Sequence, residues 1–114
     1  MPVLLRAGIA PVGVAASVSV CGNLKFDLTP DLAQVQAGRA WKAALGRRVL
    51  LLASTREGEE RLLLEALNAS SDDALAVFVP RHAQRFDAVA ALLDGPVSRR
   101  SRGEAPRRED RFFL

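Results

Sequence analysis

The sequence has very little cysteine and histidine, and this excludes several kinds of site. Its 114 residues contain one cysteine, Cys21, and one histidine, His82. A disulfide framework needs paired cysteines, and the common zinc centres need several cysteines or histidines. Cys21 has no identifiable base near it, so we expect a small packing residue and not a nucleophile. No metal ion and no cofactor are therefore expected.

Aromatic residues are also scarce, at 5% of the chain, with no tyrosine and one tryptophan. The apolar fraction of 49% and the charged fraction of 25% are typical of one globular domain with a core of Leu, Val and Ala. Residues 99–111 hold six arginines and three acidic residues, which accounts for the whole net charge of +3. This basic segment contains no aromatic residue on which a base could stack, so no nucleic-acid partner is expected.

No segment has the character of a membrane-spanning helix. The uncharged run over residues 7–24 contains Pro11, three glycines and several polar side chains, which suit a spanning helix poorly. Only Arg6 precedes this run, and its centre lacks the leucines of a secretory signal. We interpret residues 1–13 as a linker or entry segment and residues 14–21 as a buried strand.

The rest of the chain alternates between strand and helix patterns. Thr29-Pro30-Asp31 predicts a helix start with Thr29 as the N-cap, and Gly46 suits the residue just beyond its end. Continuous apolar runs indicate parallel strands that are buried on both faces. The expected strands are residues 14–21, 49–53, 74–79, 97–99 and 111–114. The expected helices are residues 30–45, 57–68 and 83–94, the first with Leu32, Val35, Trp41 and Leu45 facing inward.

This alternation predicts an α/β fold in which a parallel sheet lies between two layers of helices, as in Rossmann-like proteins. The expected domain covers residues 14–114. Within it, we expect residues 99–111 to be poorly ordered, because their many arginines would need neighbours to pack beside.

Ligands of open parallel sheets bind outside the carboxyl ends of the strands. Three polar loops occupy such positions, and they carry Lys25, Ser54, Thr55, Arg81, His82 and Arg85. Cationic and hydroxyl side chains together suit a phosphate or a carboxylate. Glu57, Glu59 and Glu60 would repel an anion from the second helix, so the anion is expected near Arg81 and His82. The same residues also fit helix caps and solvated charges, and the sequence leaves both interpretations open.

Four motifs in these loops resemble those of the 3-deoxy-D-manno-octulosonic acid (Kdo) transferases of lipopolysaccharide assembly. They are GNLKFD at residues 22–27, STREGEE at 54–60, VPRHAQRF at 79–86 and SRGE at 101–104. The family patterns are GNLKFD, STHEGEE, VPRHPERF and SxGE, in the same order and at matching spacing. Arg56 stands in place of the family's histidine, which puts any role of that imidazole in doubt.

The resemblance implies a GT-B glycosyltransferase that transfers Kdo from CMP-Kdo to a lipid A precursor. It covers only the first half of the C-terminal, donor-binding domain, so the chain is expected to be a truncated, inactive part of the enzyme. The resemblance places Arg81 and His82 against the CMP part of the donor, with Ser54, Thr55 and Glu57 lining the crevice. It assigns Lys25 to the donor's negative charge. No catalytic residue is assigned, because the family's catalytic carboxylate lies in the N-terminal domain.

The resemblance also implies that the full-length parent works at the cytoplasmic face of the bacterial inner membrane, while this part is itself soluble. Two other functions stay open. The chain could be a small α/β binding module without catalysis, or an interaction protein that acts through its basic segment.

Overall fold

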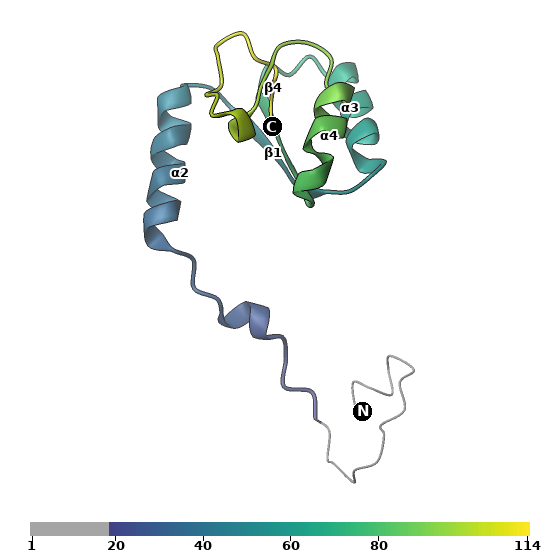
Figure 1. Cartoon of the computed structure of the whole chain (residues 1–114). Helices are drawn as coiled ribbons and strands as arrows, with labels where there is room; N and C mark the ends of the chain where they lie inside the picture. The colour runs from purple at the N-terminus through teal and green to yellow at the C-terminus, as the bar shows by residue number, and fades with distance from the viewer. Residues whose placement is uncertain (1–18) are drawn as a thin grey trace. The chain divides into compact units, whose positions relative to one another are not determined.

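Figure 1 shows the computed structural model, which describes residues 19–114. The chain divides into two compact units, residues 1–34 and residues 35–114. The described part of the first unit contains the short 3-10 helix η1, Leu24–Asp27, and the beginning of helix α2, Leu32–Leu45. Asn23 caps η1, because its side-chain oxygen accepts a hydrogen bond of 3.0 Å from the N–H of Lys25.

Helix α2 starts beside Asp31, whose carboxylate accepts hydrogen bonds from the N–H groups of Ala33 at 2.9 Å and Gln34 at 3.4 Å. The capping side chain is therefore Asp31, and the prediction of Thr29 was wrong. A carboxylate satisfies the same free N–H groups and also favours the positive end of the helix dipole. The predicted C-terminal end is confirmed, since Gly46 has a φ of 61° directly after Leu45.

The second unit contains a sheet of four strands, β1, β2, β3 and β4, whose order is β1-β2-β4-β3. The strands are β1 Val49–Thr55, β2 Leu75–Pro80, β3 Val97–Ser98 and β4 Phe112–Phe113. All paired strands are parallel. The connecting helices are α3 Glu59–Ala69, η2 Ala83–Arg85, α4 Phe86–Leu92 and η3 Arg100–Arg102. The predicted α/β class with a parallel sheet is confirmed.

The side chains of the sheet alternate between two apolar clusters. One face carries Ala76, Phe78 and Phe112, which pack with Leu64 of α3 and Val89 of α4. The opposite face carries the buried residues of the second cluster, with Leu45 at the end of α2 beside them. Those buried residues are Leu75, Val77 and Phe113. Helices α3 and α4 therefore cover one face, whereas only the C-terminal part of α2 lies against the other, so the predicted three layers are partly present.

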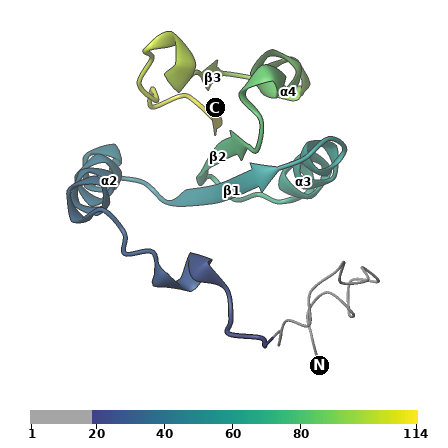
Figure 2. The same ribbon diagram turned by 60° about the horizontal axis from the view of Figure 1, so that its bottom comes forward.

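The prediction that β1 is buried on both faces was wrong. Leu50 and Leu51 are 42% and 60% exposed. The reason is the place of the strand, because β1 lies at an edge of the sheet and pairs with β2 (Figure 2). The neighbouring β2 has the expected buried apolar run, broken at Val79.

The inward face predicted for α2 is only partly present. Leu32 is 71% exposed, and Val35 and Trp41 are each 37% exposed. Trp41 still contacts Phe113 of β4, with ring centroids 5.9 Å apart. Packing against the sheet is thus made by the C-terminal part of the helix.

The N-terminal expectations concern residues that the structure describes only in part. The linker at residues 1–13 and residues 14–18 of the first expected strand lie outside the described residues. Residues 19–21 are described and do not form a strand. No helix within residues 19–114 combines the length and the apolar character needed to cross a membrane.

Candidate functional site

The carboxyl ends of β1 and β2 lie side by side. Thr55 pairs with Pro80, and the N–H of Arg81 donates to the carbonyl of Thr55 at 3.0 Å. Ser54 and Thr55 are the last residues of β1, Glu57 follows in the turn after it, and the segment after β2 holds Arg81 and His82. Parallel pairing of the two strands therefore brings these five side chains to one edge of the sheet, the edge formed by the carboxyl ends of the strands.

The chain bends sharply where β1 ends. The register of the β1–β2 pair shifts between Ala53 and Thr55, and the intervening Ser54 has a φ of 59°. Few residues other than glycine adopt this left-handed conformation, which concentrates at functional sites. Thr55 after the bend is 3% exposed, whereas Ser54 is exposed. The two neighbouring hydroxyls therefore have different environments.

The turn that leads into α3 is held by hydrogen bonds between its own residues. The N–H of Arg56 donates to Oε2 of Glu59 at 2.8 Å, and the N–H of Glu59 donates to the carbonyl of Arg56 at 3.1 Å. Gly58 lies between them with a φ of 89°. Glu59 thus holds the turn before α3, while the N-cap residue Gly58 makes no side-chain hydrogen bond, and neither Ser54 nor Thr55 caps the helix.

Glu60 and Arg85 form a buried ion pair between α3 and the loop after β2. The guanidinium donates to both carboxylate oxygens, at 2.8 and 3.1 Å, and the two side chains are 0% and 19% exposed. Burial has the largest single effect on the pKa of Glu60 and raises it, but the hydrogen bonds from Arg85, further hydrogen bonds and the charge of Arg85 together outweigh burial and leave the pKa below its ordinary value. The same hydrogen bond raises the pKa of Arg85.

This pair corrects two expectations. Arg85 is engaged by Glu60, so it is not free to hold an anion, and the charge of Glu60 is neutralised and does not repel one. The sequence carries a signal for the burial of Glu60, although not for its partner. Glu60 precedes Leu63, Leu64 and Leu67 by three, four and seven residues, the spacing of one helix face, so it had to point inward with them.

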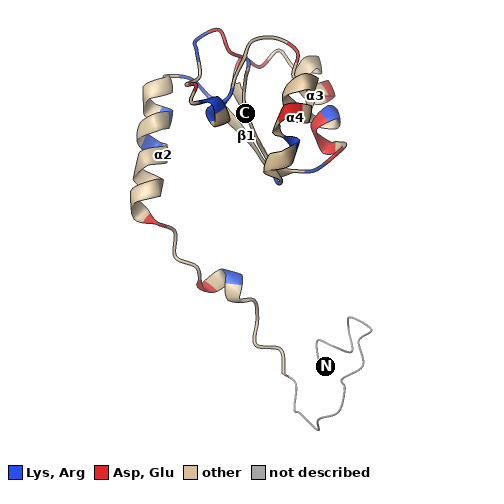
Figure 3. Ribbon diagram, viewed as in Figure 1, with Lys and Arg blue, Asp and Glu red and all other residues tan. Residues whose placement is uncertain are grey.

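Arg81, His82, Ser54 and Glu57 are all exposed, which leaves their polar groups accessible. Figure 3 shows acidic residues in the turn that leads into α3, so the edge carries both signs of charge. Lys25, the sixth predicted residue, lies on η1 in the first unit, and the other five lie in the second.

Of two hollows in the second unit, one is lined by a predicted site residue and the other is not. One of about 380 Å³, between β1 and α3, contains Thr55 and Glu59. A larger one of about 780 Å³ lies between α4 and residues 97–107, and it contains none of the predicted site residues. The chemistry of the loops and not the size of a cavity therefore defines the candidate site.

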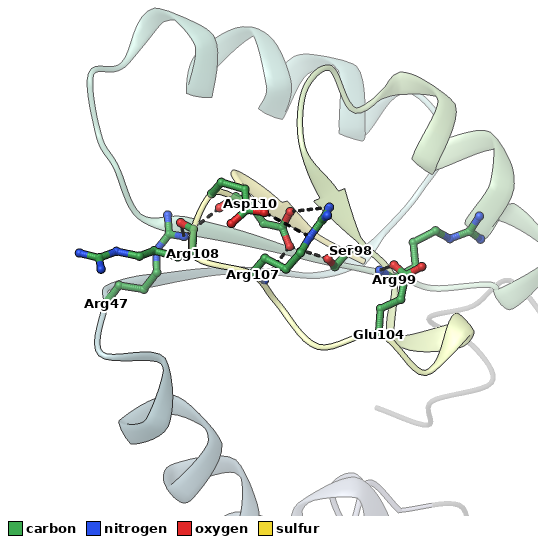
Figure 4. A network of polar contacts seen from close by, with 8 residues as sticks. Arg47, Ser98, Arg99, Glu104, Arg107, Arg108 and Asp110 are labelled. Atoms are coloured by element: carbon green, nitrogen blue, oxygen red, sulfur yellow. Dashed lines mark hydrogen bonds and ion pairs between the residues drawn. The ribbon is translucent and has the colours of Figure 1, made fainter.

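A second polar cluster holds the arginine-rich connection between β3 and β4 (Figure 4). Asp110 is 1% exposed and accepts hydrogen bonds from the hydroxyl of Ser98 and from the N–H and guanidinium of Arg107. The guanidinium of Arg47 donates to the carbonyls of Arg108, Asp110 and Asp73. Sequence reasoning placed Asp110 in the segment 99–111 that was expected to be poorly ordered. No local pattern marks Asp110 for burial, because it precedes β4 and lies outside the strand.

The expected poor order of residues 99–111 stays a prediction. These contacts argue against it, because Asp110 joins the two ends of the connection. The N–H of Arg99 also donates to Glu104 at 2.7 Å within the segment.

The chain is similar to known Kdo transferases. It is 43% identical over 98 residues to 3-deoxy-D-manno-octulosonic acid transferase of Bordetella pertussis, a match that covers 78% of this chain and 23% of the relative. It is 34% identical over 107 residues to the protein of the same name from Haemophilus influenzae, covering 85% of this chain and 25% of the relative. No model of a known protein family matches.

A solved structure is also similar to this chain. The C-terminal CMP-Kdo binding domain of WaaA from Acinetobacter baumannii has a TM-score of 0.67 and 30% identity, covering 74% of this chain and 48% of that one. The chain spans about a quarter of the length of its curated relatives. The solved domain thus shares the fold of this chain over about half of its own length, and the chain belongs to the family of 3-deoxy-D-manno-octulosonic acid transferases.

Proposed function

We propose that this chain supplies part of the CMP-Kdo donor site of a Kdo transferase. One observation carries the proposal. The paired ends of β1 and β2 bring Arg81 and His82 beside Ser54, Thr55 and Glu57, at the sheet edge where parallel α/β folds bind ligands. Similarity to a CMP-Kdo binding domain supports the same choice of ligand.

The chemistry of these side chains suits the donor. CMP-Kdo carries a phosphate and a carboxylate, and the guanidinium of Arg81 binds either with charge-assisted hydrogen bonds. The imidazole of His82 and the hydroxyl of Ser54 offer further polar contacts. Glu57 accepts hydrogen bonds from sugar hydroxyls.

In the whole enzyme, Kdo would move from the phosphate oxygen of CMP to a hydroxyl oxygen of a lipid A precursor. That hydroxyl must lose its proton to a base, and none of the residues proposed here has this role. We propose that the catalytic carboxylate and the acceptor site belong to the N-terminal domain of the parent protein. The parent would act at the cytoplasmic face of the bacterial inner membrane.

A titration of the ¹⁵N-labelled chain with CMP tests the site. The amide signals of Arg81 and His82 are expected to shift, with CMP preferred over AMP. Arg81→Ala should weaken binding by roughly tenfold or more, the effect of losing a charge-assisted hydrogen bond. Arg102→Ala is the matched control, since it removes an exposed guanidinium on η3.

The same titration distinguishes the alternatives. Shifts confined to residues 99–111, with a steep dependence on salt, would contradict the site and support binding of polyanions by the basic segment. Equal loss of affinity in both arginine variants would also contradict it.

A further inference from the structure

The buried ion pair of Glu60 and Arg85 connects α3 to the loop that carries Arg81 and His82. It is bidentate, and the carboxylate is completely buried. It is thus more rigid than an exposed pair such as Arg48–Asp72, whose side chains are 75% and 35% exposed.

The loop between these contacts is fixed at three points. At its start, the N–H of Arg81 donates to the carbonyl of Thr55 at 3.0 Å. Inside it, the N–H of Arg85 donates to the carbonyl of His82 at 3.1 Å. At its end, the guanidinium of Arg85 is held by Glu60 on α3. The short segment from Arg81 to Arg85 is therefore anchored to β1 at its start and to α3 at its end.

Stability alone does not explain a carboxylate at position 60. The other inward residues of α3 are leucines, and a buried ion pair commonly contributes no more to folding than well-packed apolar side chains of similar volume. What the pair adds is a fixed orientation of the Arg85 side chain. A bidentate contact fixes the orientation of the guanidinium, and through it the backbone of η2, where an apolar contact would not.

We propose that Glu60 is a positioning residue, which acts through Arg85 to hold Arg81 and His82 in the conformation that receives the donor. The inference rests on the function proposed above. Because the loop is already ordered before the ligand arrives, the entropy loss on binding is smaller. Glu60 itself touches no ligand, since its side chain is 0% exposed.

Two variants test this role in the whole chain. Glu60→Gln removes the charge and keeps the shape. The double variant Glu60→Leu/Arg85→Met removes the ion pair and keeps the core packed, so it stays folded if the single variant does not. Each is expected to weaken CMP binding about tenfold, since two polar side chains must then be ordered on binding. Arg85→Lys alone keeps the charge but loses the bidentate contact, so it should weaken binding less than the double variant does.

Two measurements made without CMP distinguish a positioning role of Glu60 from a role in folding alone. Hydrogen exchange at the amide of Arg81 is expected to rise in both variants, while urea unfolding of the double variant stays unchanged. The control is Asp110→Asn, which alters another buried carboxylate but lies on the connection before β4. It should reduce stability without accelerating exchange at Arg81.

The outcomes are distinct for the two proposals. If the unmodified chain does not bind CMP, the proposed function fails, and exchange at Arg81 alone decides the positioning role. If the chain binds CMP and the variants bind it equally well, the positioning role is overturned and the proposed function stands. Loss of affinity that merely follows loss of folded protein, in Asp110→Asn as in Glu60→Gln, also overturns it.

Discussion

Replacing Asp110 by alanine should unfold the arginine-rich connection and destabilise the sheet. The carboxylate accepts hydrogen bonds from the hydroxyl of Ser98, from the N–H of Arg107 at 2.7 Å, and from the guanidinium of Arg107 at 3.3 Å. Asp110→Ala removes every one of these acceptors. Ser98 is 2% exposed, so its hydroxyl would stay buried without this partner.

The expected size follows from the burial of each donor. A buried donor left without an acceptor costs about 1–3 kcal/mol. This applies to the hydroxyl of Ser98 and, more weakly, to the part-buried N–H of Arg107. The guanidinium of Arg107 adds little, because that side chain is 58% exposed. We therefore expect a loss of about 3 kcal/mol in the free energy of unfolding, a large share of the total for a small domain.

Urea unfolding, followed by circular dichroism, measures this loss. Glu109→Ala is the matched control, because Glu109 is 63% exposed and its ion pair with Arg107 is long, at 3.7 Å. It should change the free energy by less than about 0.5 kcal/mol. Hydrogen exchange of the unmodified chain then shows whether residues 99–111 are ordered. Equal effects of the two alanine variants, together with rapid exchange of the Arg107 amide, would refute the reasoning.

Other perturbations test the remaining structure. Phe78→Ala should lower the unfolding free energy by about 3–5 kcal/mol in urea, since Phe78 is 1% exposed and packs edge-on against a second phenylalanine; a loss below 1 kcal/mol would contradict the core assignment. In thermal unfolding, Gly38→Ala should stabilise by about 1 kcal/mol, because the site is helical and open, while Gly46→Ala should destabilise by about 1–2 kcal/mol at its φ of 61°; effects of the same sign would be inconsistent with this. The pKa of Glu60 lies below its ordinary 4.5 in the folded chain, so the pair's contribution is present above pH 4.5 and is lost as the pH falls through the lower folded pKa. Glu60→Gln should accordingly flatten the dependence of stability on pH below 4.5, and an unchanged slope would argue against the pair.

Much of the second unit could be predicted from local sequence. Strands 49–53 and 74–79 were recognised from their apolar runs, and Gly46 from the geometry of helix ends. The loops after these strands were likewise placed at one edge, because parallel strands align their carboxyl ends. The N-cap of α2 was misplaced, since Thr29 and Asp31 both suit that position and only the backbone conformation chooses between them.

The sequence by itself determined the fold class, the family and which loops carry polar side chains, because strand, helix and turn preferences act over a few neighbouring residues. Only the tertiary structure decided what those side chains face. It places β4 between β2 and β3 and leaves β1 at the edge, so one apolar run is buried and the other half exposed. It also joins Glu60 to Arg85 and Asp110 to Ser98. Such pairings depend on packing between distant segments, which burial in a shared core selects and no local pattern encodes.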